Sequence, residues 1–243
     1  MVQSEQEFLK QYDIRNYDVP LTTVDVAIFT LINSQLHVLM VERAEHPHKQ
    51  RWSLPGGFID LTQDTNLQQA ALRKLKQKTG VKTSHLEQVE TIGSAKRDPR
   101  GWSLTVLYMA LIPFVEPLKD DLSVTDAKWW PFEKALKQRL AFDHKVLLGQ
   151  ARDRLRAKSG YTVLPVHVLT PPFTLTQLQQ SFEELLGVAI EKKSFRRRIQ
   201  SADVLVEVGE GLPEGGRGRK AMLYKPKPGV PQHAFVRAFG VDE

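Results

Sequence analysis

The chain of 243 residues contains no cysteine. That absence excludes cysteine nucleophiles, thiolate zinc sites, iron–sulfur clusters and a disulfide framework. No apolar run approaches the roughly 18 residues that a membrane span requires. The first residues show no basic patch followed by an apolar segment, as a signal peptide would. The apolar fraction of 41% and the charged fraction of 26% are typical of a folded protein. We therefore expect a cytoplasmic protein with no membrane partner.

Positive charge is concentrated in the last part of the chain. Residues 151–243 hold 15 basic and 10 acidic side chains, whereas residues 1–150 hold 19 and 18. Such an excess is compatible with a solvated surface. It is equally compatible with a patch that binds a polyanion such as DNA, RNA or anionic lipid. Charge alone does not choose between these two interpretations.

The first 140 or so residues alternate predicted strands with one clear helix. Residues 21–42 predict two strands, residues 103–114 a long buried strand and residues 126–132 a short one. Residues 67–79 place apolar side chains at helical spacing, and Gly80 ends that helix. This order predicts an α/β domain, in which helices sandwich a mixed sheet.

A helical pattern over residues 142–158 follows, and we expect it to end at Ser159-Gly160. It connects the two parts of the chain. We therefore divide the chain into one domain over residues 1–150 and a second over residues 151–243.

The second part predicts a winged helix-turn-helix. Thr174 and Gln177 form a capping-box pattern before an apolar stripe, and Gly187 ends that helix. A second helix begins near Lys192. The segments DVLVEV and RKAMLYKP then predict two strands joined by a Gly/Pro-rich tip. In such modules the second helix enters the major groove of DNA and the wing contacts the backbone or the minor groove.

The predicted DNA-binding residues lie off the apolar face that Phe195, Ile199 and Ala202 form on the second helix. We expect Ser194 to cap this helix or to contact a phosphate. The alternatives are a basic surface on a dimerisation module and an RNA-binding or scaffold protein. The full set of DNA-binding candidates is Lys192, Lys193, Ser194, Arg196, Arg197, Arg198 and Gln200 on the helix, with Arg217, Arg219 and Lys220 at the wing.

Residues 56–81, GGFIDLTQDTNLQQAALRKLKQKTGV, resemble the Nudix box of the Nudix hydrolase fold. The positions that match its scaffold are Gly57, Arg73, Leu75, Gly80 and Val81. In that family three glutamates share one face of the helix and hold Mg²⁺ against a diphosphate. Lys74, Gln77 and Lys78 stand at those positions here, and two ammonium groups and an amide do not bind a divalent cation. We therefore expect a Nudix fold with no metal site and no catalytic residues.

The alternative is an active Nudix hydrolase that cleaves ADP-ribose-type nucleoside diphosphates. It would need replacement carboxylates, and the nearby candidates are Asp60, Asp64 and Glu90. Their spacing fits no helical triad.

The segment GSAKRDPRGWSLTVLY, residues 93–108, resembles the RDPRGW-type loop of Nudix proteins that handle ADP-ribose. Such a ligand needs cations for its diphosphate, aromatic faces for adenine and polar groups for its ribose hydroxyls. Lys74 or Lys78 would supply charge in place of the metal. The candidate cations are Arg43, Arg51, Lys96, Arg97 and Arg100, the candidate aromatic faces are Trp52, Phe58 and Trp102, and the candidate for the ribose is Asp98.

A degenerate Nudix box followed by a winged helix resembles the bacterial Nudix-related transcriptional regulators called NrtR, over residues 20–230. The resemblance implies a homodimeric repressor of NAD biosynthesis or salvage genes that binds a palindromic operator and is nucleoid-associated when bound. It also implies an effector, ADP-ribose or a related NAD-derived metabolite, that releases the DNA, with no cofactor required. Residues 142–144 begin the connecting helix, so a ligand that contacts them would reposition it.

Overall fold

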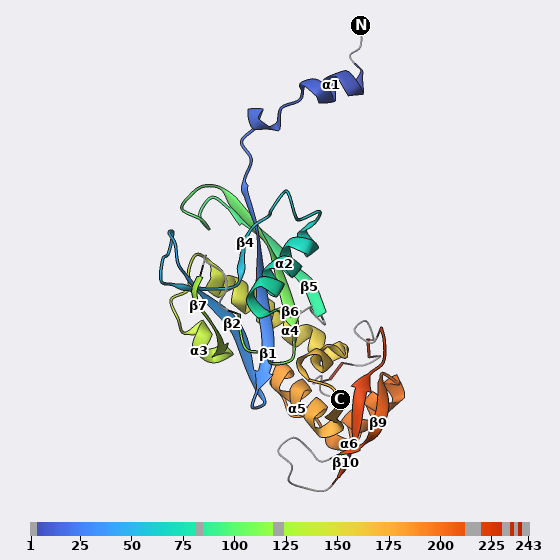
Figure 1. The fold of residues 1–243 in the computed structure, drawn as a ribbon. Helices are drawn as coiled ribbons and strands as arrows, with labels where there is room; N and C mark the ends of the chain where they lie inside the picture. The colour runs from blue at the N-terminus through green and yellow to red at the C-terminus, as the bar shows by residue number, and fades with distance from the viewer. Residues whose placement is uncertain are drawn as a thin grey trace.

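The described residues of the computed structural model are 4–80, 85–118, 124–211, 220–229, 234–235 and 238–239. A sheet-and-helix domain is followed by a smaller domain of helices and a short sheet (Figure 1). The N-terminal segment, with α1 (Glu5–Gln11) and the short 3-10 helix η1 (Ile14–Asn16), projects from the larger domain. Among the described residues, no helix has the length and apolar character needed to cross a membrane.

The larger sheet is mixed, as predicted. Its central strand β1 pairs in parallel with β6 and antiparallel with β2 and β4. Strand β5 pairs with β6 at one edge, and the sequence patterns did not predict it. The seven strands are β1 (Leu21–Ile32), β2 (Gln35–Arg43), β3 (Trp52–Ser53), β4 (Gly56–Phe58), β5 (His85–Ser94), β6 (Ser103–Leu111) and β7 (Val124–Pro131).

Helices cover both faces of this sheet because β1 alternates its side chains between them. Val24, Val26 and Ile28 pack with the buried face of α2 (Leu67–Thr79). Ala27 and Phe29 pack on the opposite face with α4 (His144–Tyr161) and with α3 (Phe132–Leu136). A strand buried on both faces reads as a nearly continuous apolar run, as β1 does. The predicted helix–sheet–helix arrangement is confirmed.

Helix α4 connects the two domains and is longer than predicted. It continues through Ser159 and Gly160 to Tyr161. The buried Ser159 hydroxyl donates to the Leu155 carbonyl at 2.8 Å, so the polar side chain is satisfied inside the helix. The predicted domain boundary at residue 150 therefore falls within one continuous helix.

The predicted winged helix is confirmed by its element order. Helix α5 (Leu175–Leu186) and helix α6 (Lys192–Ala202) precede strands β9 (Leu205–Gly211) and β10 (Ala221–Pro226). Strand β10 pairs with β9 on one side and with the short β8 (Phe173–Thr174) on the other. The short helix η2 (Leu164–Val168) joins α4 to this unit.

Of the two roles expected for Ser194, a helix cap or a phosphate contact, the cap is wrong. The carboxylate of Glu191, not the hydroxyl of Ser194, caps α6, since it accepts hydrogen bonds from the amides of Lys193 and Ser194 at 2.8 and 2.6 Å. A carboxylate is well placed at a helix N-terminus, where free amides and the helix dipole favour negative charge.

The capping box of α5 generates a prediction about stability. The Thr174 hydroxyl accepts a hydrogen bond from the main-chain amide of Gln177 at 3.2 Å. The side-chain oxygen of Gln177 in turn accepts one from the main-chain amide of Thr174 at 2.8 Å. Thr174→Ala should therefore lower the free energy of unfolding by about 1 kcal/mol, measured by urea denaturation. Thr176→Ala, at an exposed position in the first turn of α5, is the matched control and should change it little. Equal losses in the two variants would contradict the capping role.

Candidate effector pocket and nucleic-acid interface

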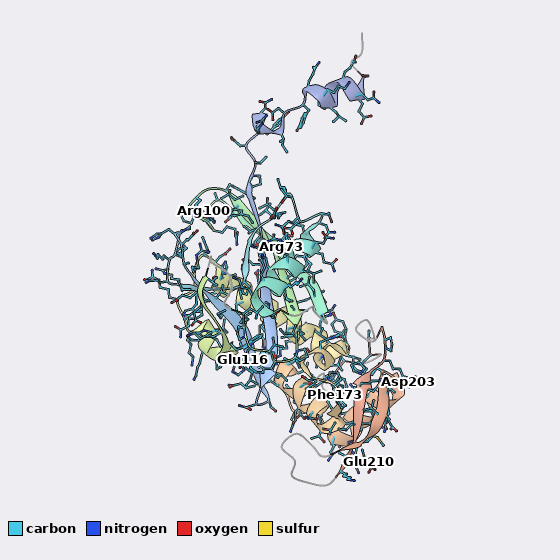
Figure 2. All side chains as sticks on the ribbon, in the orientation of Figure 1. Arg73, Arg100, Glu116, Phe173, Asp203 and Glu210 are labelled. Carbon is cyan, nitrogen blue, oxygen red and sulfur yellow. The ribbon has the colours of Figure 1, made fainter. Side chains whose placement is uncertain are left out.

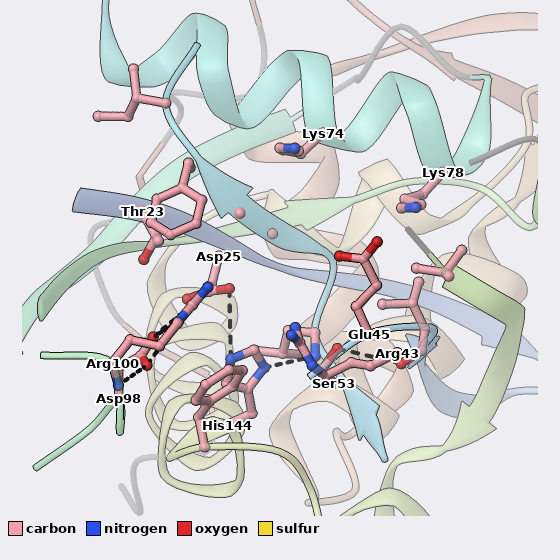
Figure 3. Close-up of a pocket in the computed structure, with 18 of the residues that line it drawn as sticks. Thr23, Asp25, Arg43, Glu45, Ser53, Lys74, Lys78, Asp98, Arg100 and His144 are labelled. Carbon is pink, nitrogen blue, oxygen red and sulfur yellow. Dashed lines mark hydrogen bonds and ion pairs between the residues drawn. The ribbon is translucent and has the colours of Figure 1, made fainter. Parts of the chain in front are cut away.

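A cavity of about 590 Å³ opens between β1, β4, α2 and the start of α4 (Figure 3). Its lining is strongly charged, with six cationic and four acidic side chains. The cations are Arg43, Arg73, Lys74, Lys78, Arg97 and Arg100, and the carboxylates are Asp25, Glu45, Asp60 and Asp98. This excess of positive charge suits an anionic ligand.

A buried ionic cluster lies at one side of the pocket. The Asp25 carboxylate, on β1, accepts a hydrogen bond from the Thr105 hydroxyl at 2.7 Å and lies 3.7 Å from the Arg97 guanidinium. Arg97 also donates to the Asp143 carboxylate from two nitrogens, at 3.0 and 3.1 Å. Asp143 is the residue immediately before α4. The loop after β5 is thereby held to the start of that helix.

His144, the first residue of α4, joins this cluster. Its Nδ1 accepts a hydrogen bond from the Leu54 amide at 2.9 Å, and its Nε2 lies 3.8 Å from the Asp25 carboxylate. Burial lowers the pKa of His144, although the nearby charge of Asp25 opposes this effect. A neutral imidazole whose proton is on Nε2 fits both contacts.

Lysines face the cavity where the Nudix box has metal ligands (Figure 3). Lys78 is buried and Lys74 half-buried, and the Lys74 ammonium lies close to the backbone of Gly57. Gln77, the third of these positions, is exposed and does not line the cavity. Over the residues that the structure describes, no group of three or more His, Asp or Glu side chains is placed to hold a metal ion.

Aromatic rings and guanidinium groups alternate in the lining of the pocket. The Arg100 guanidinium lies 5.1 Å from the ring centre of Phe58 and 5.9 Å from that of Phe142. Arg43 lies 4.8 Å from the Phe142 ring. Burial raises the pKa of Asp98, but hydrogen bonds from Arg100 outweigh it, so the net pKa is lowered and the carboxylate stays ionised. The layered faces can stack with a planar base.

The structure brings five of the nine predicted effector residues to this pocket: Arg43, Phe58, Arg97, Asp98 and Arg100. The other four do not line it. Trp52 packs against Trp130 with ring centres 5.2 Å apart, and Trp102 covers Gly93. Arg51 and Lys96 lie in neighbouring loops, half-buried and exposed respectively.

The carboxylates proposed for a hydrolase do not form a metal-ligand set. Asp60 lines the cavity, and its main-chain amide donates to the Asp64 carboxylate at 2.8 Å, but that carboxylate is bound by Arg73. Glu90 is exposed on β5. No two of them share a helix face.

Sequence reasoning missed Asp25 as a site residue and gave His144 no role beyond its place at the helix start. Asp25 carried a usable signal, because a charged residue within the apolar run VDVAIFTL is costly to bury without a partner. The side chains that pair with Asp25 lie about 70 residues or more further along the chain, so the residues next to Asp25 do not indicate which they are.

The basic face of α6 lies at the other end of the molecule, as Figure 2 shows by the separation of Arg73 and Arg100 from Asp203. Lys192, Lys193, Arg196, Arg197 and Gln200 are exposed, and so is Lys220 at the base of the wing. Ser194 and Arg198 are half-buried. The predicted contacts Arg217 and Arg219 lie outside the described residues.

The ion pair between Arg73 and Asp64 predicts a pH-dependent stability. Hydrogen bonds from Arg73 lower the pKa of Asp64 from 3.8 to about 2. Since the native pKa lies below the unfolded one, the pair stabilises the fold above about pH 4 and loses this effect as the pH falls towards 2. Asp64→Asn should therefore lose about 1–2 kcal/mol at neutral pH and progressively less in acid, measured by urea unfolding across pH.

Arg73→Gln should show the same pH profile, and the double variant should be little worse than either single one. A deficit that is equally large near pH 2 would contradict this interpretation of the pair.

Known protein families match both parts of the chain. The NUDIX domain matches residues 21–150, and the NrtR DNA-binding winged helix domain matches residues 165–225. The chain is 49% identical over 222 residues to the ADPR responsive transcriptional repressor NtrR of Acinetobacter baylyi, which covers 91% of this chain and 88% of that protein.

Solved structures of NrtR are also similar to this chain. Shewanella oneidensis NrtR, alone and complexed with a 27mer DNA, matches with a TM-score of 0.83 and 46% identity, over 90% of this chain and 99% of that chain. The NUDIX domain of the same protein complexed with ADP ribose matches with a TM-score of 0.61 and 47% identity, over 63% of this chain and 99% of that chain. With a NUDIX domain followed by an NrtR DNA-binding winged helix domain, the chain belongs to the NrtR family.

Proposed function

We propose that this protein is a transcriptional repressor whose winged helix binds operator DNA and whose Nudix pocket binds ADP-ribose, which releases the DNA. The observation that carries the proposal is the presence of both halves in one chain, matched over nine-tenths of its length to a repressor and to a protein solved with DNA. One helix, α4, starts at the pocket and ends at the winged helix. A ligand therefore has a continuous element on which to act.

The DNA-binding half is supported by the exposed cations of α6. Lys193, Arg196 and Arg197 project from the helix whose opposite face, Phe195 and Ile199, is buried in the domain. Cations on the exposed face of such a helix contact phosphates, and arginines there can also read guanine edges. We infer that Arg217, Arg219 and Lys220 add backbone contacts at the wing.

The pocket suits the parts of ADP-ribose. We assign the diphosphate to the side where α2 presents Lys74 and Lys78, because ammonium groups pair with phosphate oxygens. The adenine ring would stack near Phe58 and Arg100, where the guanidinium carbon lies 5.1 Å from the centre of the phenyl ring.

We also propose that the protein does not hydrolyse this ligand. Hydrolysis in a Nudix pocket needs a metal that positions water and neutralises developing charge. Lys74 and Lys78 supply fixed positive charge at that place, but an ammonium group neither binds nor deprotonates water as a divalent cation does.

A homodimer on a palindromic operator completes the proposal. A twofold dimer presents two copies of α6 to half-sites about one helical turn, or a multiple of it, apart. The regulated genes would be those of NAD biosynthesis or salvage, and the repressor would act on the bacterial chromosome in the cytoplasm.

The test is binding of the full chain to duplex DNA from the promoter of its own gene, with and without ADP-ribose at fixed salt. We expect specific retention that ADP-ribose weakens by about 5–150-fold. Arg197→Ala should weaken binding and lower the slope of log affinity against log salt by about one, because one phosphate contact is lost. Lys145→Ala, an exposed cation on α4 near the pocket end, is the matched control and should bind DNA as the wild type does.

Specific retention of DNA that ADP-ribose does not change would exclude ADP-ribose as the effector but would support the repressor function. No specific retention, together with Mg²⁺-dependent release of AMP from ADP-ribose, would overturn the proposal in favour of the hydrolase.

The role of the pocket lysines can be tested separately by calorimetry. Lys74→Met keeps the apolar stem and removes the charge, so ADP-ribose should bind about tenfold more weakly. Lys76→Met, on the exposed face of the same helix, should bind it normally. Wild-type affinity should not depend on Mg²⁺. A strong increase in affinity on adding Mg²⁺ would show that the pocket recruits a metal after all.

A further inference from the structure

Arg198 differs from the other basic residues of α6 in what it touches. Its guanidinium donates a hydrogen bond to the main-chain oxygen of Ala238 at 3.0 Å and lies 4.7 Å from the ring centre of Phe239. Its side chain is half-buried, whereas Arg196 and Arg197 are exposed. The structure thus directs Arg198 towards the C-terminal end of the chain, although sequence periodicity had grouped it with the DNA contacts.

The residues that Arg198 touches belong to the core of the winged helix. We call Phe235, Ala238 and Phe239 the C-terminal clasp. Phe239 is 5% exposed, and its ring centre lies 5.2 Å from that of Phe182 on α5 and 5.8 Å from that of Phe195 on α6. The ring centre of Phe235 lies 4.9 Å from that of Phe239. The clasp therefore packs against both helices of the helix-turn-helix, although it follows the wing in the sequence.

The same clasp binds the last turn of α4. The Phe235 amide donates to the Tyr161 carbonyl at 2.7 Å, and the Phe239 amide donates to the Gly160 carbonyl at 2.6 Å. The last carbonyls of a helix have no partner within the helix, so the clasp satisfies two that would otherwise need water. The clasp is thereby joined to α4 through its main chain and to α6 through Arg198.

The opposite end of α4 is the wall of the pocket. His144 begins the helix and is held by Leu54 and Asp25. The helix has 18 residues and so spans about 27 Å. Because it is one helix, a tilt at His144 also displaces Gly160 and Tyr161, where the clasp is bound.

We propose that the C-terminal clasp positions the recognition helix α6 on the end of α4, and that Arg198 is a positioning residue and not a DNA contact. The consequence for the operator rests on the proposed function, since the angle of α6 sets affinity only if α6 binds DNA. The clasp lies beyond residue 225, where the match to the winged helix domain ends. It gives α4 a second connection to α6, in addition to the packing of α4 against α5.

The first experiment needs no DNA. Phe239→Leu keeps an apolar side chain but removes the ring, and Arg198→Lys keeps the charge but removes the planar guanidinium that stacks and reaches Ala238. Arg197→Lys, the exposed neighbour, is the matched control. Amide hydrogen exchange on each full chain should become faster in α6 and in the last turn of α4 for the first two variants, with the larger sheet and the control unchanged. Unchanged exchange in α6 would overturn the proposal.

The second experiment measures operator binding by the wild type and by Phe239→Leu and Arg198→Lys. A positioning role predicts about tenfold weaker binding for Phe239→Leu and for Arg198→Lys, with the salt slope of the wild type. The double variant should be no weaker than the weaker single one, because both break one connection. ADP-ribose should also change the affinity of the variants by a smaller factor than it changes that of the wild type.

The inference would be overturned if Phe239→Leu bound the operator as tightly as the wild type does and Arg198→Gln lowered the salt slope by about one. Arg198 would then be a phosphate contact. If the wild-type chain binds no operator, the proposed function fails. The exchange measurement then still decides whether the clasp holds α6 to α4, so the two failures are distinguishable.

Discussion

The buried carboxylate of Asp25 is the group on which the pocket depends. It is 5% exposed in the middle of the larger sheet, and a charge so buried is costly unless it is paired and hydrogen-bonded. Its partners come from three places: Thr105 on β6, Arg97 on the loop after β5, and His144 on α4. Satisfying one charge thereby fixes a strand, a loop and a helix. It also requires glycine at residue 56, because a Cβ there would lie 2.0 Å from the Asp25 carboxylate.

The consequence is that the pocket and the winged helix share a rigid element. Asp143 and His144 connect the start of α4 to the buried cluster. Arg152, in the middle of α4, donates a hydrogen bond to the Leu185 carbonyl of α5 at 2.8 Å. The Leu36 amide also donates to the Glu184 side chain across the domains, at 2.8 Å. Two domains joined in this way cannot be moved independently by small distortions, because packed interfaces switch between arrangements and do not deform continuously.

Local signals predicted most of the fold and only part of the site. Residues close together in the sequence determine the side-chain pattern of β1, the helical spacing in α2 and the capping box of α5. These elements were therefore predicted correctly. Strand β5 was missed because it is a largely polar edge strand without a clear apolar alternation. The position of the RDPRGW loop was predicted, but the loop's ion pair to Asp143, 46 residues away, was not. The same holds for Arg198. Helical periodicity places it on one face of α6, but periodicity does not show which distant segment of the chain contacts that face.

The proposed sensor role of Lys74 and Lys78 has a thermodynamic rationale. A ligand shifts an equilibrium by the difference in its affinity for the two states, and only for as long as it stays bound and intact. A metal-activated water would cleave the diphosphate and end the signal at the rate of catalysis. In the proposed sensor, Lys74 and Lys78, which line the pocket, would attract the phosphates without activating water. The occupied state of such a sensor would last until the ligand dissociates, so occupancy would follow the concentration of the ligand.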